Sequence, residues 1–141
     1  MNSIKMKLLL LILLCVWGME IDAYDVTVTE FPLLNQLPTK RIMNIFQDSE
    51  GYIWLGTNDG LNRYNGYEFK HYKHDKYDKN SIANNYIVDI IEDKNGYIWV
   101  STIGGLSRIN PDKDEIKNYY SEKDNGNLLD SNIWRILYTR E

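Results

Sequence analysis

The stretch DSEGYIWLGTNDGLNR, residues 48–63, returns as DKNGYIWVSTIGGLSR at residues 93–108, 45 residues further along the chain. Nine of the sixteen aligned positions are identical. A segment that recurs at such a spacing is typical of repeat proteins, in which one unit is too small to form a core and buries its apolar face against its neighbours. The sequence therefore predicts an architecture made of units of about 45 residues.

The repeat extends beyond this stretch and begins a third time. An Ile-x-x-Ile spacing precedes both copies and recurs near the C-terminus, at Ile42 and Ile45, Ile87 and Ile90, and Ile133 and Ile136. The chain ends before a third Trp motif, so we expect an N-terminal fragment of a longer protein. The shared positions that we expect to have structural roles are Asp48, Gly51, Trp54, Thr57, Gly60 and Leu61 in the first copy and Asp93, Gly96, Trp99, Thr102, Gly105 and Leu106 in the second.

Each unit is predicted to contain four short β-strands, because runs rich in Ile, Tyr, Trp, Val and Thr alternate with turn signals. Asp at the first and Gly at the fourth position of the first turn are the preferences of a type I turn. The expected strands are 42–47, 52–57, 61–64 and 68–72, then 87–92, 97–102, 106–109 and 116–120.

Four antiparallel strands repeated in tandem match the blade of a β-propeller. We therefore predict an all-β fold, a partial β-propeller of four-stranded antiparallel blades with two complete repeats and the start of a third. A β-sandwich is the alternative, but it gives no reason for a copy at fixed spacing. The expected propeller units within 38–141 are 38–82, 83–128 and the incomplete 129–141.

Trp54 and Trp99 occupy the same place in the two copies. A Trp at a repeated position suits packing between blades, since an interior blade is covered on both faces and a Trp buries roughly 150–250 Å². Burial is therefore expected, and a platform that stacks on sugars is the alternative. Trp134 matches the apolar residues Met43 and Val88, so we expect it to be buried too.

The N-terminus has the layout of a secretory signal peptide, expected at 1–23 and followed by an extended segment at 24–37. Two Lys precede an apolar run over 8–17, which is shorter than the roughly 20 residues of a membrane-spanning helix. Cleavage after Ala23 would remove Cys15, the only cysteine. An uncleaved anchor and a lipid-modified Cys15 are the alternatives.

Composition and motifs exclude several classes of function. The net charge of −4 offers no electrostatic footprint for nucleic acid. No cofactor or metal site is predicted: the glycines of 56–60 lack the Lys and helix of a phosphate loop, and 93–97 has its Gly at the wrong position for an EF-hand. No paired carboxylates or activated serine stand out, so no catalytic residue is predicted.

The repeated pattern resembles the two-component-regulator propeller repeat, found in the periplasmic sensor regions of hybrid two-component systems. The residues of the first copy that fit it are Ile42, Ile45, Asp48, Gly51, Tyr52, Ile53, Trp54, Gly56, Thr57, Gly60, Leu61 and Arg63. The second copy departs from it only at Ser101, where the first has a Gly. In the third, Thr139 stands where the turn Asp belongs.

The resemblance implies an exported, periplasmic sensing segment of a receptor that is anchored in the inner membrane. In this family a further β domain, a membrane helix, a histidine kinase and a receiver follow the propellers, and the kinase is absent from this chain. The implied partners are further propeller blades, an oligosaccharide from polysaccharide breakdown and a second copy in a homodimer. A secreted propeller enzyme, a carbohydrate-binding protein and a non-catalytic interaction scaffold are the alternatives.

Ligand contacts are expected in the loops that join second to third strands and one blade to the next, because these emerge on one face of a propeller. They carry Asn58 and Asp59, then Asn84 and Asn85. Ile103 replaces the first of these in the second copy, as expected where repeats diverge for function. The alternative is that these side chains only satisfy turn backbones.

Overall fold

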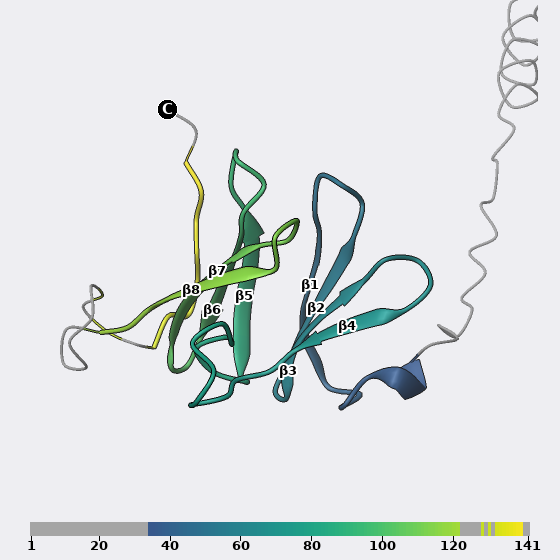
Figure 1. Ribbon diagram of the computed structural model, residues 1–141, viewed down its shortest axis with the longest axis horizontal. Helices are drawn as coiled ribbons and strands as arrows, with labels where there is room; N and C mark the ends of the chain where they lie inside the picture. Colours follow the sequence, from purple (N-terminus) through teal and green to yellow (C-terminus); the bar gives the residue numbers. More distant parts are fainter. Residues whose placement is uncertain (1–33, 122–127, 129, 131, 140–141) are drawn as a thin grey trace, which may run out of the picture. The chain divides into compact units, whose positions relative to one another are not determined.

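The computed structural model describes residues 34–121, 128, 130 and 132–139 (Figure 1). The predicted signal peptide lies outside these residues, as does most of the segment 24–37, so both stay predictions. No helix within the described residues is long and apolar enough to cross a membrane. The one helical element there is a 3-10 turn, η1, at Leu34–Gln36.

Eight β-strands form two antiparallel sheets of four, each with its strands in sequence order (Figure 1). The first sheet, blade 1, holds β1 Ile42–Gln47, β2 Ile53–Thr57, β3 Gly60–Tyr64 and β4 Phe69–Tyr72. The second, blade 2, holds β5 Ile87–Glu92, β6 Ile98–Thr102, β7 Gly105–Asn110 and β8 Glu115–Tyr119. Every predicted strand is present, and the all-β, partial-propeller fold class is confirmed.

The turn between β1 and β2 shows why Asp recurs in each copy. Gly51 adopts a φ of 89° and donates its N–H to the Asp48 carbonyl at 3.1 Å. The Asp48 carboxylate accepts the Tyr52 N–H at 2.8 Å with Oδ1 and the Trp54 indole N–H at 2.7 Å with Oδ2. One buried carboxylate thus closes the turn and satisfies the indole, whose N–H would otherwise be buried without a partner.

Blade 2 repeats this arrangement through Asp93. Its carboxylate accepts the Tyr97 N–H at 3.2 Å and the Trp99 indole N–H at 2.7 Å. The expected structural role of the two Asp residues is therefore present, and the bond to the indole adds a contact that the turn pattern alone did not predict.

The two sheets pack through unlike faces. The side of blade 1 that bears Trp54, which we call its Trp face, lies against the side of blade 2 that bears Ile98 and Val100. The side chains in this core are Trp54, Leu61, Tyr72, Ile82, Ile87, Ile90, Ile98, Val100 and Ile109. Trp54 is 0% exposed, as expected for packing between blades.

Gly56 sets how closely the sheets approach. A Cβ built at this position would lie 2.7 Å from Cγ2 of Ile87, closer than two carbons can come without movement. The glycine therefore lets the first strand of blade 2 lie directly on β2. Blade 2 has Ser101 here, fully buried, and its hydroxyl has no hydrogen-bond partner among the described residues.

The Trp face of blade 2 is only partly covered. Trp99 and Leu106 are half-buried, whereas their counterparts Trp54 and Leu61 are 0% exposed. The prediction that Trp134 is buried is wrong, since 75% of it is exposed. Its counterpart Met43 is also 39% exposed. The prediction failed because the apolar character of a position in the opening strand does not by itself reveal which face of the sheet it occupies.

We predict that a protein of residues 24–141, without the predicted signal peptide, self-associates in solution. The Trp face of blade 2 leaves Trp99 and Leu106 only half-buried, and incompletely covered apolar side chains on a sheet promote association. Light scattering and thermal melts over a range of concentrations should therefore give a mass above that of a monomer and a midpoint that rises with concentration. A monomer with one sharp, concentration-independent transition would contradict this.

We predict that Asp48→Ala lowers the stability of the protein more than Asp93→Ala does. Asp48→Ala leaves the indole N–H of the buried Trp54 without a partner, which costs about 1–3 kcal/mol. The half-buried Trp99 can bond water instead, so Asp93→Ala should cost less. The measurement is the apparent Tm of both variants at one protein concentration, and a larger loss for Asp93→Ala would refute the assignment.

Candidate functional site

The loops predicted to contact a ligand lie together at one edge of the blades, here called the lower edge as drawn in Figure 1. It holds the β2–β3 turn, the β6–β7 turn and the connection 73–86 between β4 and β5. The Gly60 N–H donates to the carbonyl of Asn85 at 2.8 Å, which ties the β2–β3 turn to the connection. The structure thus brings together the two loop classes that carry the predicted residues.

Asn58 and Asp59 form the tip of the β2–β3 turn. The Thr57 hydroxyl donates to the Gly60 carbonyl at 2.7 Å and accepts the Asp59 N–H at 3.0 Å, so the repeated Thr rather than the tip residues closes this turn. Asp59 pairs with Lys73 at 2.8 Å in an exposed ion pair, and Asn58 is exposed. Both side chains are therefore accessible from solvent.

Asn84 and Asn85 each bond to backbone through the side-chain oxygen. Asn84 accepts the Tyr86 N–H at 2.9 Å, and Asn85 accepts the His74 N–H at 2.7 Å. These contacts agree with the alternative role as loop formers. The amide nitrogens of both residues have no hydrogen bond within the described part of the chain, so each keeps donors for a ligand.

The second copy fills the same edge differently. Thr102 closes its turn as Thr57 does, donating to the Gly105 carbonyl at 2.7 Å. A Cβ at Gly104 would lie 3.0 Å from Cβ of Asn84, so a larger residue would crowd the connection. Of the residue pair that matches Asn58 and Asp59, Ile103 is exposed and Gly104 offers only backbone. The polar tip therefore belongs to the first copy.

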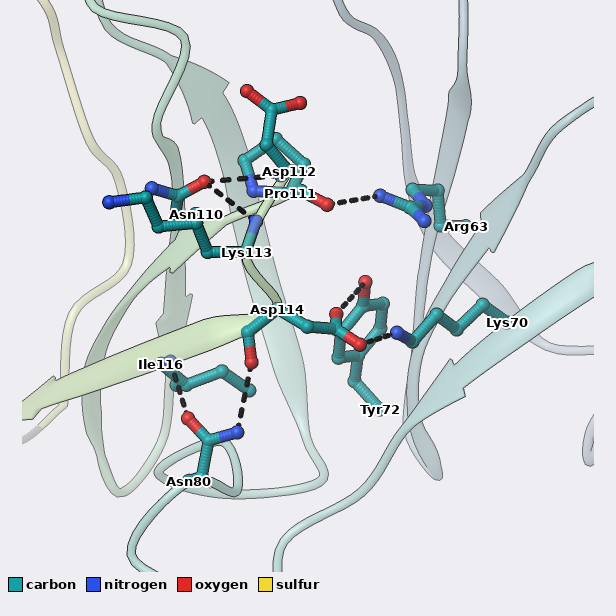
Figure 2. Close-up of polar contacts among 10 residues, drawn as sticks. All are labelled: Arg63, Lys70, Tyr72, Asn80, Asn110, Pro111, Asp112, Lys113, Asp114 and Ile116. Carbon is teal, nitrogen blue, oxygen red and sulfur yellow. Dashed lines mark hydrogen bonds and ion pairs between the residues drawn. The ribbon is translucent and has the colours of Figure 1, made fainter.

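At the opposite, upper edge, a polar junction links the blades (Figure 2). Arg63 of β3 donates through Nη1 to the Pro111 carbonyl at 3.1 Å. Lys70 of β4 forms an ion pair with Oδ2 of Asp114, and the Tyr72 hydroxyl donates to Oδ1 of Asp114 at 3.2 Å. Three side chains of blade 1 thus hold the β7–β8 turn of blade 2.

Asp114 adopts a left-handed conformation, with a φ of 60°. Asp is among the few residues besides Gly that visit this region, and a non-glycine residue there is uncommon. Asn80 supports it from the connection, donating to the Asp114 carbonyl at 2.9 Å and accepting the Ile116 N–H at 2.7 Å (Figure 2). The turn is therefore held from both sides with its carboxylate toward Lys70.

Burial shifts the pKa values of both groups that face Asp114. Burial raises the pKa of Tyr72, with the Arg63 charge opposing it, so the phenol stays a donor at neutral pH. Burial, and secondly the charge of Arg63, lowers the pKa of Lys70. The Asp114 carboxylate acts in the opposite sense, because an adjacent negative charge favours the ammonium.

A hollow of about 330 Å³ lies between the blades at the upper edge, lined in part by Tyr52, Glu92 and Tyr97. Glu92 closes one side, accepting the backbone N–H and the hydroxyl of Ser49 at 2.8 and 2.6 Å. The hollow is thus polar and walled by both blades. Within the described residues, no three His, Cys, Asp or Glu side chains could together hold a metal ion.

The sequence did not predict the Asp114 junction. A signal was present in the length of one hairpin: Leu61 pairs with Tyr72, whereas its counterpart Leu106 pairs with Tyr119, two residues further along the chain. The extra residues lengthen the paired strands, while the turn has four residues in each copy. A difference in hairpin length between otherwise matched repeats could have pointed to the junction.

Comparisons with known proteins agree with this geometry. Residues 36–59 and 81–104 match the family model of the two component regulator propeller. A stretch of 53 residues is 38% identical to a protein named Histidine kinase P4 from Formosa agariphila, and covers 38% of this chain but 4% of that protein. The chain thus spans a small part of this relative's length.

Solved structures give the same result. The extracellular domain of BT3049 from B. thetaiotaomicron, described as a hybrid two component system, is similar with a TM-score of 0.60 and 27% identity, over 68% of this chain and 14% of that one. The extracellular domain of BT4673 from the same organism shares the fold, with a TM-score of 0.52 at 24% identity over 63% of this chain and 13% of that one. Two segments of the chain therefore match the two-component regulator propeller repeat, and the chain is homologous to the extracellular sensor domains of two-component systems.

Proposed function

We propose that this chain is part of the ligand-sensing propeller of a two-component receptor, and that its ligand is an oligosaccharide released from a polysaccharide. The observation that carries the proposal is the lower edge, where accessible polar side chains from the β2–β3 turn meet amide donors from the connection between blades. The homology to extracellular sensor domains supports the sensing role.

The chemistry of this edge suits sugar hydroxyls. Asn58 is exposed, and Asn84 and Asn85 keep amide donors, while the Asp59 carboxylate accepts hydrogen bonds. A sugar offers adjacent hydroxyls that both donate and accept hydrogen bonds. These amide donors and the carboxylate acceptor can therefore bind a sugar although it carries no charge. The exposed ion pair of Asp59 with Lys73 contributes little to stability and can rearrange around a ligand.

The same edge offers a route from binding to signal. The Gly60 to Asn85 bond joins a turn of blade 1 to the chain that enters blade 2. A ligand held by both sides would bias the spacing of the blades, as required of any ligand that shifts a conformational equilibrium. We further propose an exported, membrane-anchored receptor that carries additional blades, acts as a homodimer and passes the signal to a kinase.

The test is titration of the receptor's whole extracellular region with a panel of purified oligosaccharides by calorimetry. We predict that the double variant Asn58→Ala and Asp59→Ala weakens binding about tenfold or more, because it removes one neutral and one charged hydrogen-bonding group. Tyr67→Ala is the matched control, since Tyr67 is 86% exposed on the β3–β4 turn at the upper edge of the same blade.

Circular dichroism should show that both variants keep the fold. Unchanged affinity in the double variant, or an equal loss with Tyr67→Ala, would remove the lower edge of blade 1 from the ligand site. Asn84→Ala provides a second measurement from the connection, and it should weaken binding as well.

A further inference from the structure

Blade 2 carries a second copy of the side chains that form the junction in Figure 2. In blade 1, Arg63, Lys70 and Tyr72 form hydrogen bonds and an ion pair with the β7–β8 turn. The corresponding residues on the Trp face of blade 2 are Arg108, Lys117 and Tyr119, which occupy the same positions in the register of their strands. The pairing of strands thus places the same three functional groups on the next face.

The geometry is also preserved. The Arg63 guanidinium lies 4.8 Å from the centre of the Tyr52 ring, and that of Arg108 lies 4.4 Å from Tyr97. The ammonium to Tyr ring distance is 5.3 Å for both Lys70 and Lys117. The Trp and Tyr rings stack at 5.7 Å in blade 1 and 5.6 Å in blade 2. Blade 2 therefore has the same arrangement of cations and rings before any partner is present.

The place of the acidic turn on this face is open. Lys117 has no ion pair within the described residues, whereas Lys70 is paired with Asp114. A hollow of about 360 Å³ lies here, and its lining includes Tyr97, Arg108 and Lys117. Glu115 is the one acidic side chain in that lining. In blade 1 the two cations bind a turn, whereas their counterparts in blade 2, Arg108 and Lys117, border an empty space.

The segment 132–139 indicates what fills it. Asp89 of β5 accepts the Asn44 amide of β1 at 3.1 Å with Oδ1 and the Ile136 N–H at 3.0 Å with Oδ2. One carboxylate therefore bridges the opening strands of blades 1 and 2 and the opening segment of the third repeat. The opening segment of the third repeat thus lies beside β5.

We propose that the next blade of the same polypeptide, packed on the Trp face of blade 2 as neighbouring propeller blades are, presents an acidic turn between its third and fourth strands to Arg108, Lys117 and Tyr119. A backbone carbonyl of that turn bonds Arg108, and a carboxylate bonds Lys117 and Tyr119. The inference rests on the proposed function in one respect, that further blades follow in the receptor.

The chemistry argues for a carboxylate in this turn. An amide could accept the Tyr119 hydroxyl but would leave the Lys117 ammonium without a counter-charge as the face is covered, and unpaired charges are costly to bury. The hairpin must also be of the longer type found in blade 2. In the shorter hairpin of blade 1 the last turn residue is Glu68, which is exposed and whose backbone N–H bonds Asn65 of the same turn.

The test is zero-length cross-linking of the receptor's extracellular region with a carbodiimide, which joins a lysine amine to a carboxylate in direct contact as an amide. Peptide mass spectrometry then identifies the pairs. Lys70 to Asp114 is the internal standard. We expect Lys117 to cross-link, in similar yield, to an Asp or Glu in the turn between the third and fourth strands of the third blade, and Lys117→Gln to abolish this product alone.

Lys113 is the matched control, since it is exposed on the β7–β8 turn and should give no dominant product. Mixing ¹⁴N- and ¹⁵N-labelled receptor separates cross-links within one polypeptide from those between two. The proposal is overturned if Lys117 forms no cross-link while Lys70 does, if its partner lies on a second copy, or if its partner lies outside that turn. None of these outcomes depends on a ligand, so a failed oligosaccharide titration leaves the test valid.

Discussion

The structure depends on close packing between two unlike sheet faces, at a point where Gly56 leaves no room for a Cβ beside Ile87. Blade 1 has no other way to bury Trp54 and Leu61, because both lie on the face that blade 2 covers. The Asp48 carboxylate keeps the indole satisfied inside this contact. With the blades this close, the polar residues at their two edges come within hydrogen-bonding distance of each other.

The edges follow from this packing. At the lower edge the connection 73–86 is drawn against the β2–β3 turn, which places the candidate ligand residues together. At the upper edge the β7–β8 turn reaches Arg63 and Lys70 on the facing sheet (Figure 2). Both edges depend on the same packing between the two sheets. A ligand that alters the spacing of the blades at one edge therefore also affects the contacts at the other edge. This gives a sensor made of repeats a physical means of transmitting binding.

Much of the fold could be predicted from the sequence, since the repeat fixes the period and the alternation of β-formers and turns fixes each strand. The roles of the repeated Asp and Trp followed from turn chemistry and size, whereas the hydrogen bonds by which the repeated Thr closes the β2–β3 and β6–β7 turns were not predicted. Trp134 was placed wrongly because its apolar character does not specify a face. The Asp114 junction was missed because it joins Lys70 and Asp114, which lie 44 positions apart in the sequence. The direction of the Asp114 side chain also depends on the left-handed backbone conformation of this residue.

A double-mutant cycle on Gly56→Ser and Ile87→Ala tests the packing of the blades most directly. Gly56→Ser alone should cost about 1–3 kcal/mol by overpacking against Ile87, and Ile87→Ala alone about 2–5 kcal/mol by leaving a cavity. Because Ile87→Ala removes the atom that the added Cβ would strike, we predict that the double variant loses less stability than the two single losses combined, by about 1 kcal/mol or more. Additive losses, measured by urea unfolding at one protein concentration, would contradict the contact between Gly56 and Ile87.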